Sequence, residues 1–159
     1  MAKTPMTKSS FQILEKELKY LKSVERQSII NDIATARALG DLSENAEYHA
    51  AREKQAFVES RIGELENKLS GSHVIDVTKL SGKIVKFGAT VSIIEEVTKV
   101  KKRYHIVGED EADLSKNKLS FLSPISRSLI GRKVGDIIDV NGPGGVNYYE
   151  IVFLEYKEF

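Results

Sequence analysis

The feature that most constrains the fold is a long stretch, residues 7–39, that contains neither glycine nor proline. Apolar side chains recur in its first half at spacings of three and four residues, at Phe11, Leu14, Leu18 and Leu21. This spacing is typical of a coiled-coil helix, because the apolar residues of a strand would alternate. We expect Thr7, just after Pro5, to cap the helix and Gly40 to end it.

The apolar pattern changes register in the middle of this stretch. The next positions of the repeat fall on the polar residues Glu25 and Ser28, and the pattern resumes one residue later at Ile29, Ile33 and Ala36. We therefore expect a local kink or register shift within one helical segment.

A second helical pattern predicts a helix over residues 42–70, ended by Gly71. Its apolar positions are Tyr48, Ala51, Val58, Ile62, Leu65 and Leu69. Because only a short turn joins the two helices, they must pack antiparallel. Roughly thirty residues at 1.5 Å each make a hairpin about 45 Å long.

After Gly71 the pattern changes to short β-type runs. Ser123 and Pro124 have the residue types of a helix start, an N-cap followed by proline at the first position, and Gly131 is the expected end of that short helix. Residues 141–145 are a glycine-rich turn, and no helix follows it to bind phosphate. The predicted strands are residues 83–87, 89–97, 100–107, 118–122, 136–140 and 146–156.

These patterns predict an α+β protein with two domains. Residues 1–75 form an N-terminal antiparallel α-helical coiled-coil hairpin, and residues 76–159 form a C-terminal antiparallel β-sheet domain with a short helix. The 24 basic and 23 acidic residues nearly cancel, which argues against a general nucleic-acid or membrane-surface binder. The chain has no cysteine and no apolar run long enough for a membrane span, so we expect a soluble cytoplasmic protein.

Carboxylates are concentrated in the turn between the helices. Asp41, Glu44 and Glu47 follow one another at three-residue intervals, whereas the three histidines are scattered and the motifs of self-contained active sites are missing. Asp41 and Glu44 also match a capping box, in which Asp41 caps the second helix and Glu44 bonds back to it. The two roles are compatible, because a capping carboxylate uses only part of its acceptor capacity.

Two carboxylates suggest a role with Mg²⁺, which keeps several waters and is commonly bound by one or two carboxylates plus phosphate oxygens. On a solvated turn the pair would bind it weakly. Within another protein's active site, Asp41 and Glu44 would complete a second metal site, and two metals stabilise the attacking and leaving oxygens of an in-line displacement.

The chain resembles the GreA type of the Gre family, bacterial transcription elongation factors that stimulate transcript cleavage. The most specific segment is GDLSENAEYHAARE, residues 40–53, and the other segments occur in the same order as in that family. These are PMT at residues 5–7, VGEDEAD at 107–113, SPI at 123–125 and LIG at 129–131.

The resemblance implies that the hairpin enters the secondary channel of bacterial RNA polymerase and contacts the nascent RNA 3′ end of a backtracked complex. Asp41 and Glu44 match the two tip acids that help to hold a second Mg²⁺ of the polymerase, so the factor lends ligands and is not itself a nuclease. Arg37 and Arg52 match a small basic patch that contacts RNA, although isolated arginines are often merely solvated. We expect a monomer with no stably bound metal and no membrane partner.

The resemblance also implies that the second domain is FK506-binding-protein-like and docks at the channel rim. Ser123, Pro124 and Ile125 match the docking segment, and their interpretation as a helix cap is equally good. The basic run of Lys99, Lys101, Lys102 and Arg103 is best explained as a solvated sheet edge.

Two alternatives remain at this point. One is a channel-binding inhibitor that does not promote cleavage, which would not need the pair Asp41 and Glu44. The other is a prolyl isomerase or chaperone, suggested only by the expected fold of the second domain.

Overall fold

The computed structural model describes residues 3–159, which divide into two compact units. The helical unit is Phe11–Ser72, and the β-rich unit combines Lys3–Ser10 with His73–Phe159. We expected the helical domain to span residues 1–75, whereas the structure groups the described N-terminal residues with the C-terminal part of the chain. No helix within residues 3–159 combines the length and apolar character needed to cross a membrane.

The first helical stretch consists of three consecutive segments. They are α1 (Lys8–Tyr20), a π-helix η1 (Leu21–Glu25) and α2 (Arg26–Arg37). A π-helix bonds each residue to the fifth one along instead of the fourth, so a single turn inserts one residue into the pattern. The register shift expected near Glu25 is therefore confirmed, and its physical form is η1. The Oγ1 of Thr7 accepts from the backbone N–H of Ser10 at 3.2 Å and caps α1, as predicted.

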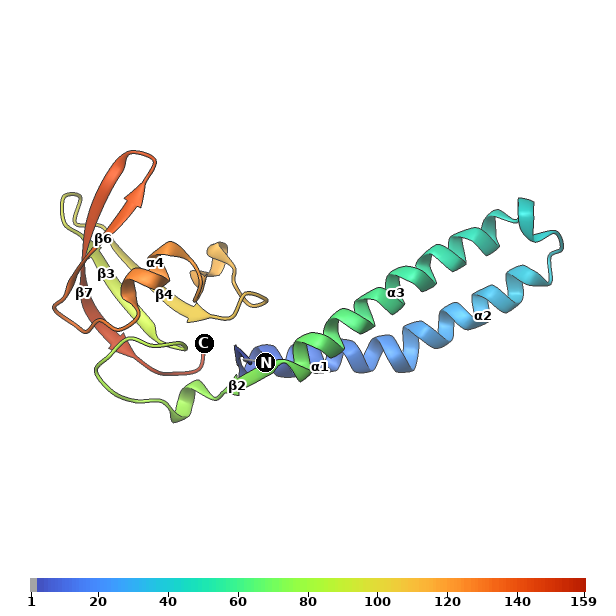
Figure 1. The fold of residues 1–159 in the computed structure, drawn as a ribbon, viewed down its shortest axis with the longest axis horizontal. Coiled ribbons are helices and arrows are strands. Elements are labelled where there is room, and N and C mark those ends of the chain that lie inside the picture. The colour runs from blue at the N-terminus through green and yellow to red at the C-terminus, as the bar shows by residue number, and fades with distance from the viewer. Residues whose placement is uncertain (1–2) are drawn as a thin grey trace. The chain divides into compact units, whose positions relative to one another are not determined.

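The two helical arms pack antiparallel through the predicted apolar positions. After a short 3₁₀ turn, η2 (Leu42–Glu44), the second arm is α3 (Ala46–Ser70), and Figure 1 shows α3 running back alongside α2. The buried side chains between them are Ile29, Ile33, Ala51, Val58 and Ile62, with Leu18, Leu21 and Tyr48 packed against this cluster.

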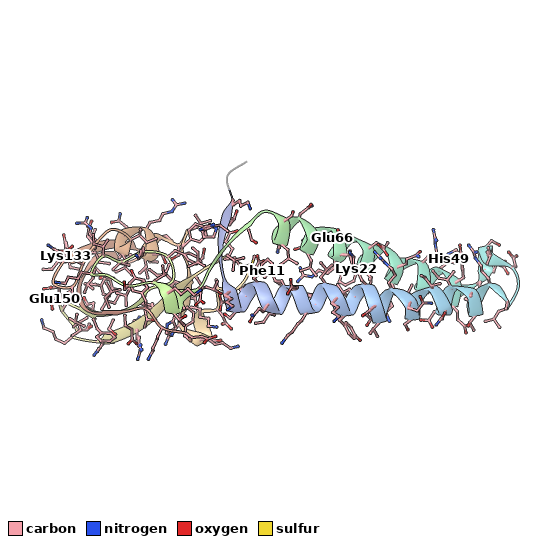
Figure 2. All side chains as sticks on the ribbon, turned by 90° about the horizontal axis from the view of Figure 1, so that it is seen from below. Phe11, Lys22, His49, Glu66, Lys133 and Glu150 are labelled. Atoms are coloured by element: carbon pink, nitrogen blue, oxygen red, sulfur yellow. The ribbon has the colours of Figure 1, made fainter. Side chains whose placement is uncertain are left out.

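Ion pairs on the surface of the hairpin join the facing arms. Arg26 forms two hydrogen bonds with the carboxylate of Glu59, at 2.8 and 2.9 Å. Lys22 and Glu66, labelled in Figure 2, lie 3.3 Å apart between charged atoms. Exposed pairs of this kind add little stability, but opposite charges at matched positions favour this register over a slipped one.

The β-rich unit contains a five-stranded sheet in the order β5-β4-β3-β7-β6. Neighbouring strands are antiparallel except β4 and β5, which are parallel, so the sheet is mixed where we expected a purely antiparallel one. The strands are β3 (Thr90–Glu95), β4 (Lys101–Val107), β5 (Lys118–Ser120), β6 (Ile137–Gly142) and β7 (Gly145–Glu155).

The helix α4 (Pro124–Leu129) belongs to this unit, and its Leu129 is fully buried in the core. The core also contains Val85, Val91, Ile93, Ile106, Ile138 and Ile151.

One predicted strand was wrong, and two short strands were not predicted. Residues 83–87 form no strand, and their ladder contact is a single bridge between Ile84 and Lys133. Two short strands were missed, β1 (Thr4–Thr7) and β2 (Ser72–Ile75), which pair into a separate small sheet. The 3₁₀ turns η3 (Val77–Lys79) and η4 (Leu114–Lys116) complete the described elements.

Candidate functional site at the hairpin tip

The tip is the chain between α2 and α3. Helix α2 ends at Arg37, and Gly40 then adopts φ +119°, a conformation that strongly favours glycine. This glycine reverses the chain before the 3₁₀ turn η2, so that Asp41 and Glu44 flank a short, exposed turn.

Asp41 is held in an ionised state by its own turn. Its Oδ1 accepts hydrogen bonds from the backbone N–H of Ser43 at 3.0 Å and from the Ser43 hydroxyl at 2.9 Å. The backbone bond, then the hydroxyl bond, lower the pKa of Asp41 below its usual value. The other oxygen of Asp41 has no hydrogen-bond partner among the described residues and faces solvent, so it remains available to a ligand.

The predicted capping box is wrong in its details. Asp41 caps η2, while α3 is capped by Asn45, whose Oδ1 accepts from the backbone N–H of Tyr48 at 3.0 Å. Within residues 3–159, the side chain of Glu44 forms neither a hydrogen bond nor an ion pair. Because the 3₁₀ turn η2 lies between Asp41 and α3, the turn and the helix each have their own cap, Asp41 and Asn45. Glu44 therefore takes no part in capping.

The acidic side chains surround one shallow depression. Asp41, Glu44 and Glu47 line it together with Leu39, Asn45 and Ala46. Hard cations such as Mg²⁺ prefer carboxylate oxygens of this kind. In the described part of the chain, however, no group of three or more potential ligands is arranged to hold a metal. The tip therefore suits a metal that receives further ligands from elsewhere.

Arg37 and Arg52 flank the tip on the ends of the two helices. The guanidinium carbon of Arg37 lies 5.8 Å from the ring centre of Tyr48, and Nη1 of Arg52 donates to Oε1 of Gln55 at 3.1 Å. Both arginines are exposed, and neither forms an ion pair with a carboxylate among residues 3–159. Their positive charge thus remains available for a phosphate.

The structure supports the helix-cap interpretation of Ser123. Its Oγ accepts from the backbone N–H of Ser126 at 3.3 Å, and Pro124 occupies the first turn of α4. Pro124 is exposed, whereas Ile125 is half-buried and packs against the core of the β-rich unit. The docking role of these three residues stays a prediction.

The basic run at Lys99–Arg103 begins in the turn between β3 and β4 and continues into β4. Lys99 has φ +60° in that turn, and Arg103 pairs with Glu155 across the sheet. These contacts are those of a solvated sheet edge, and the structure gives no further role for the run.

Asn45 and His49, which no sequence pattern singled out, hold the tip from the start of α3. His49, labelled in Figure 2, has its Nε2 3.3 Å from the carbonyl oxygen of Ser43. Asn45 was recognisable as a cap by residue type, but Asp41 is an equally good cap and the sequence alone does not choose between them.

The fold and the tip together define a class of protein: a helical hairpin that presents exposed carboxylates on its turn, followed by a mixed β unit. Two family models match consecutive parts of the chain, "Transcription elongation factor, N-terminal" over residues 4–74 and "Transcription elongation factor, GreA/GreB, C-term" over residues 80–156. The chain belongs to the GreA/GreB family of transcription elongation factors.

Two full-length sequence relatives agree with this assignment. The chain is 55% identical over 156 residues to transcription elongation factor GreA of Caulobacter vibrioides, covering 98% of this chain and 99% of the relative. It is 57% identical over 158 residues to transcription elongation factor GreA of Rickettsia bellii, covering 99% and 98%. A solved GreA/GreB structure from Nitrosomonas europaea, 22% identical and covering 97% of this chain and 100% of that one, superposes with a TM-score of 0.44.

Proposed function

We propose that this chain is a transcription elongation factor that inserts its hairpin into the secondary channel of bacterial RNA polymerase and stimulates cleavage of the 3′ end of backtracked nascent RNA. The observation that carries the proposal is the tip, where Asp41 and Glu44 are exposed and border one depression. Similarity to GreA factors over nearly the whole chain supports it.

In this proposal the two carboxylates are ligands lent to the polymerase. Asp41 keeps one oxygen for the turn and offers the other, while the Glu44 carboxylate is free to rotate toward the same depression. A Mg²⁺ held there would stabilise the attacking and leaving oxygens of phosphodiester cleavage. Because the described residues supply too few ligands for a closed site, the free protein should not retain the metal.

The arginines and the β-rich unit have supporting roles in the same proposal. Arg37 and Arg52 are exposed and form no ion pair within residues 3–159, so in this proposal they contact RNA phosphates and position the 3′ end. Pro124 is an exposed apolar contact at the start of α4, and we assign it, with Ser123 and Ile125, to docking on the polymerase.

The decisive test compares Asp41→Asn and Glu44→Gln with the parent on stalled, backtracked polymerase. Asn keeps an oxygen that can accept the two bonds from Ser43, and Gln replaces a side chain with no partner to lose, so the melting temperature should not change. Cleavage should fall at least about a hundredfold, as when a preorganised electrostatic group is removed. Survival of cleavage in both variants would overturn the metal-ligand role.

The alternatives considered from sequence are not favoured. Both halves of the chain match elongation-factor models, and the tip acids that a simple channel blocker would not need are present and exposed. The isomerase hypothesis had only fold analogy behind it.

A further inference from the structure

One side chain at the tip bonds to both arms of the hairpin. Asn45 is half-buried, and while its Oδ1 caps α3, its Nδ2 donates to the carbonyl oxygen of Ala36 in the last turn of α2, at 2.6 Å. Its backbone N–H also donates to the carbonyl of Leu42 at 3.4 Å, and its carbonyl accepts from the N–H of His49 at 3.1 Å. Asn45 therefore caps α3 and also links the two arms; we call its Nδ2 bond to the carbonyl oxygen of Ala36 the clasp.

The clasp closes the loop that carries the functional carboxylates. Asp41 and Glu44 both lie between Ala36 and Asn45. Among residues 3–159, the side chain of Asp41 bonds only to Ser43 in the same turn, and the side chain of Glu44 forms no hydrogen bond. The carboxylates therefore have no direct anchor to the packed helices. Their position depends on how firmly the loop backbone is held, by Asn45 at its end and by the contact of His49 Nε2 with the carbonyl oxygen of Ser43. Of these two side chains, Asn45 is the one that reaches back to α2.

We propose that Asn45 is a positioning residue for transcript cleavage: by bonding Ala36 it holds the loop in the one geometry in which Asp41 and Glu44 share a metal. The inference rests on the function proposed above. An ordered loop should raise the cleavage rate, because both carboxylates must reach the same ion and a misplacement of a catalytic group by about 1 Å can reduce a rate by about a hundredfold. The N-cap bond alone fixes only the α3 end of the loop.

The two roles of Asn45 can be separated by substitution. Ser and Asp cap helices about as well as Asn, but neither has an amide that reaches back to Ala36. Asn45→Ser removes the clasp without adding charge, and Asn45→Asp removes it while adding a carboxylate. A defect shared by both variants therefore reports on the clasp and not on charge. Asn45→Ala removes cap and clasp together and is the control for loss of the cap.

The first measurement uses the free protein. In Asn45→Ser and Asn45→Asp we expect an unchanged melting temperature and helix content, because the cap is retained. Backbone ¹⁵N relaxation should show lower order parameters at residues 41–44, with no change in the middle of α3. Unchanged order at the tip in both variants would overturn the proposal without reference to any activity.

The second measurement uses backtracked polymerase at saturating factor. We expect the maximum cleavage rate to fall about tenfold in both clasp variants, less than the loss expected for a displaced ligand. The factor concentration for half-maximal cleavage should not change. The Mg²⁺ concentration for half-maximal cleavage should rise, because disordered ligands bind the ion more weakly.

The outcomes distinguish the two proposals. If Asp41→Asn abolishes cleavage but both clasp variants cleave like the parent, the function stands and the role of Asn45 is wrong. If only Asn45→Ala is defective, the cap matters and the clasp does not, which also overturns the inference. If Asp41→Asn and Glu44→Gln both cleave normally, the metal-ligand role proposed for the two carboxylates fails, whatever order is seen at the tip.

Discussion

At the scale of single residues, the same short motif orders three aspartates. Asp41, Asp76 and Asp113 each accept hydrogen bonds from the backbone and the hydroxyl of the Ser or Thr two residues later, and each begins a 3₁₀ turn. These bonds lower the pKa of each aspartate. Only Asp41 lies at the hairpin tip, so a common structural device there also keeps a proposed metal ligand ionised.

The motif predicts how Ser43→Ala changes titration. The variant loses the hydroxyl donor and keeps the backbone donor, so the pKa of Asp41 should rise part of the way toward its usual value. Because the folded pKa lies below the unfolded one, the related stability is present above the unfolded pKa and disappears as the pH falls through the folded pKa. Because Ser43→Ala raises the folded pKa of Asp41, the pH interval between its folded and unfolded pKa, over which this stability is lost, should become narrower.

Carboxyl ¹³C NMR titration measures this shift directly. Asp113 is the internal control, because its partner Ser115 is untouched in the variant. If Asp41 titrates identically in parent and variant, the hydroxyl bond is not a cause of its lowered pKa.

At the scale of secondary-structure elements, η1 reconciles two apolar patterns that are one residue out of phase. Leu18 lies before η1 and Leu21 is its first residue, whereas Ile29 and Ile33 follow it in α2, and both groups pack against the cluster shared with α3. A regular α-helix through the same sequence would turn one of these groups about 100° away. The π-helix is the local solution that buries both.

This interpretation predicts the effect of deleting one residue. Deletion of Ser23 removes the extra residue of η1, so a regular α-helix should then bury both apolar groups. We expect a melting temperature within about 3 °C of the parent, because the buried contacts are kept. Deletion of Asn31 from α2 is the matched control: it rotates Ala36 by about 100° away from α3 and should lower the melting temperature by roughly 10 °C or more.

Circular dichroism during thermal unfolding tests the pair of deletions. Equal destabilisation by both would mean that η1 is more than a register adjustment.

At the scale of the whole molecule, residues 3–10 belong to the unit built by the second half of the chain. Strand β1 pairs with β2, and Gly108 lies so close to β1 that an added Cβ would be 3.1 Å from the carbonyl oxygen of Pro5. The Glu111 carboxylate, only 8% exposed, accepts hydrogen bonds from the hydroxyls of Thr7 and Ser9 and pairs with Lys118. The segment VGEDEAD therefore includes a residue that secures the N-terminal strand.

Glu111→Ala should accordingly destabilise the β-rich unit. Removing a buried carboxylate that satisfies two hydroxyls and an ammonium should lower the free energy of unfolding by about 2 kcal/mol. Chemical denaturation monitored by NMR signals of core residues in this unit provides the measurement. Glu109→Ala, at an exposed position in the same segment, should leave stability nearly unchanged. A similar loss in both variants would argue against the specific role of Glu111.

The sequence by itself determined what depends on neighbours along the chain. Helical periodicity, the shift before Ile29, the cap at Thr7 and the start of α4 at Ser123 were all predictable, because each depends on residues within a turn or two. The same holds for the site: charge and exposure on a turn indicated Asp41 and Glu44.

Only the tertiary structure decided what depends on residues distant in sequence. The pairing of β1 with β2, the parallel direction of β5 and the loss of the strand expected at residues 83–87 depend on which segments meet, and no local pattern encodes that. The clasp has the same origin. Asn45 was visible as a possible cap, but its bond to Ala36 exists only because packing of the two arms brings the end of α2 within reach of the start of α3.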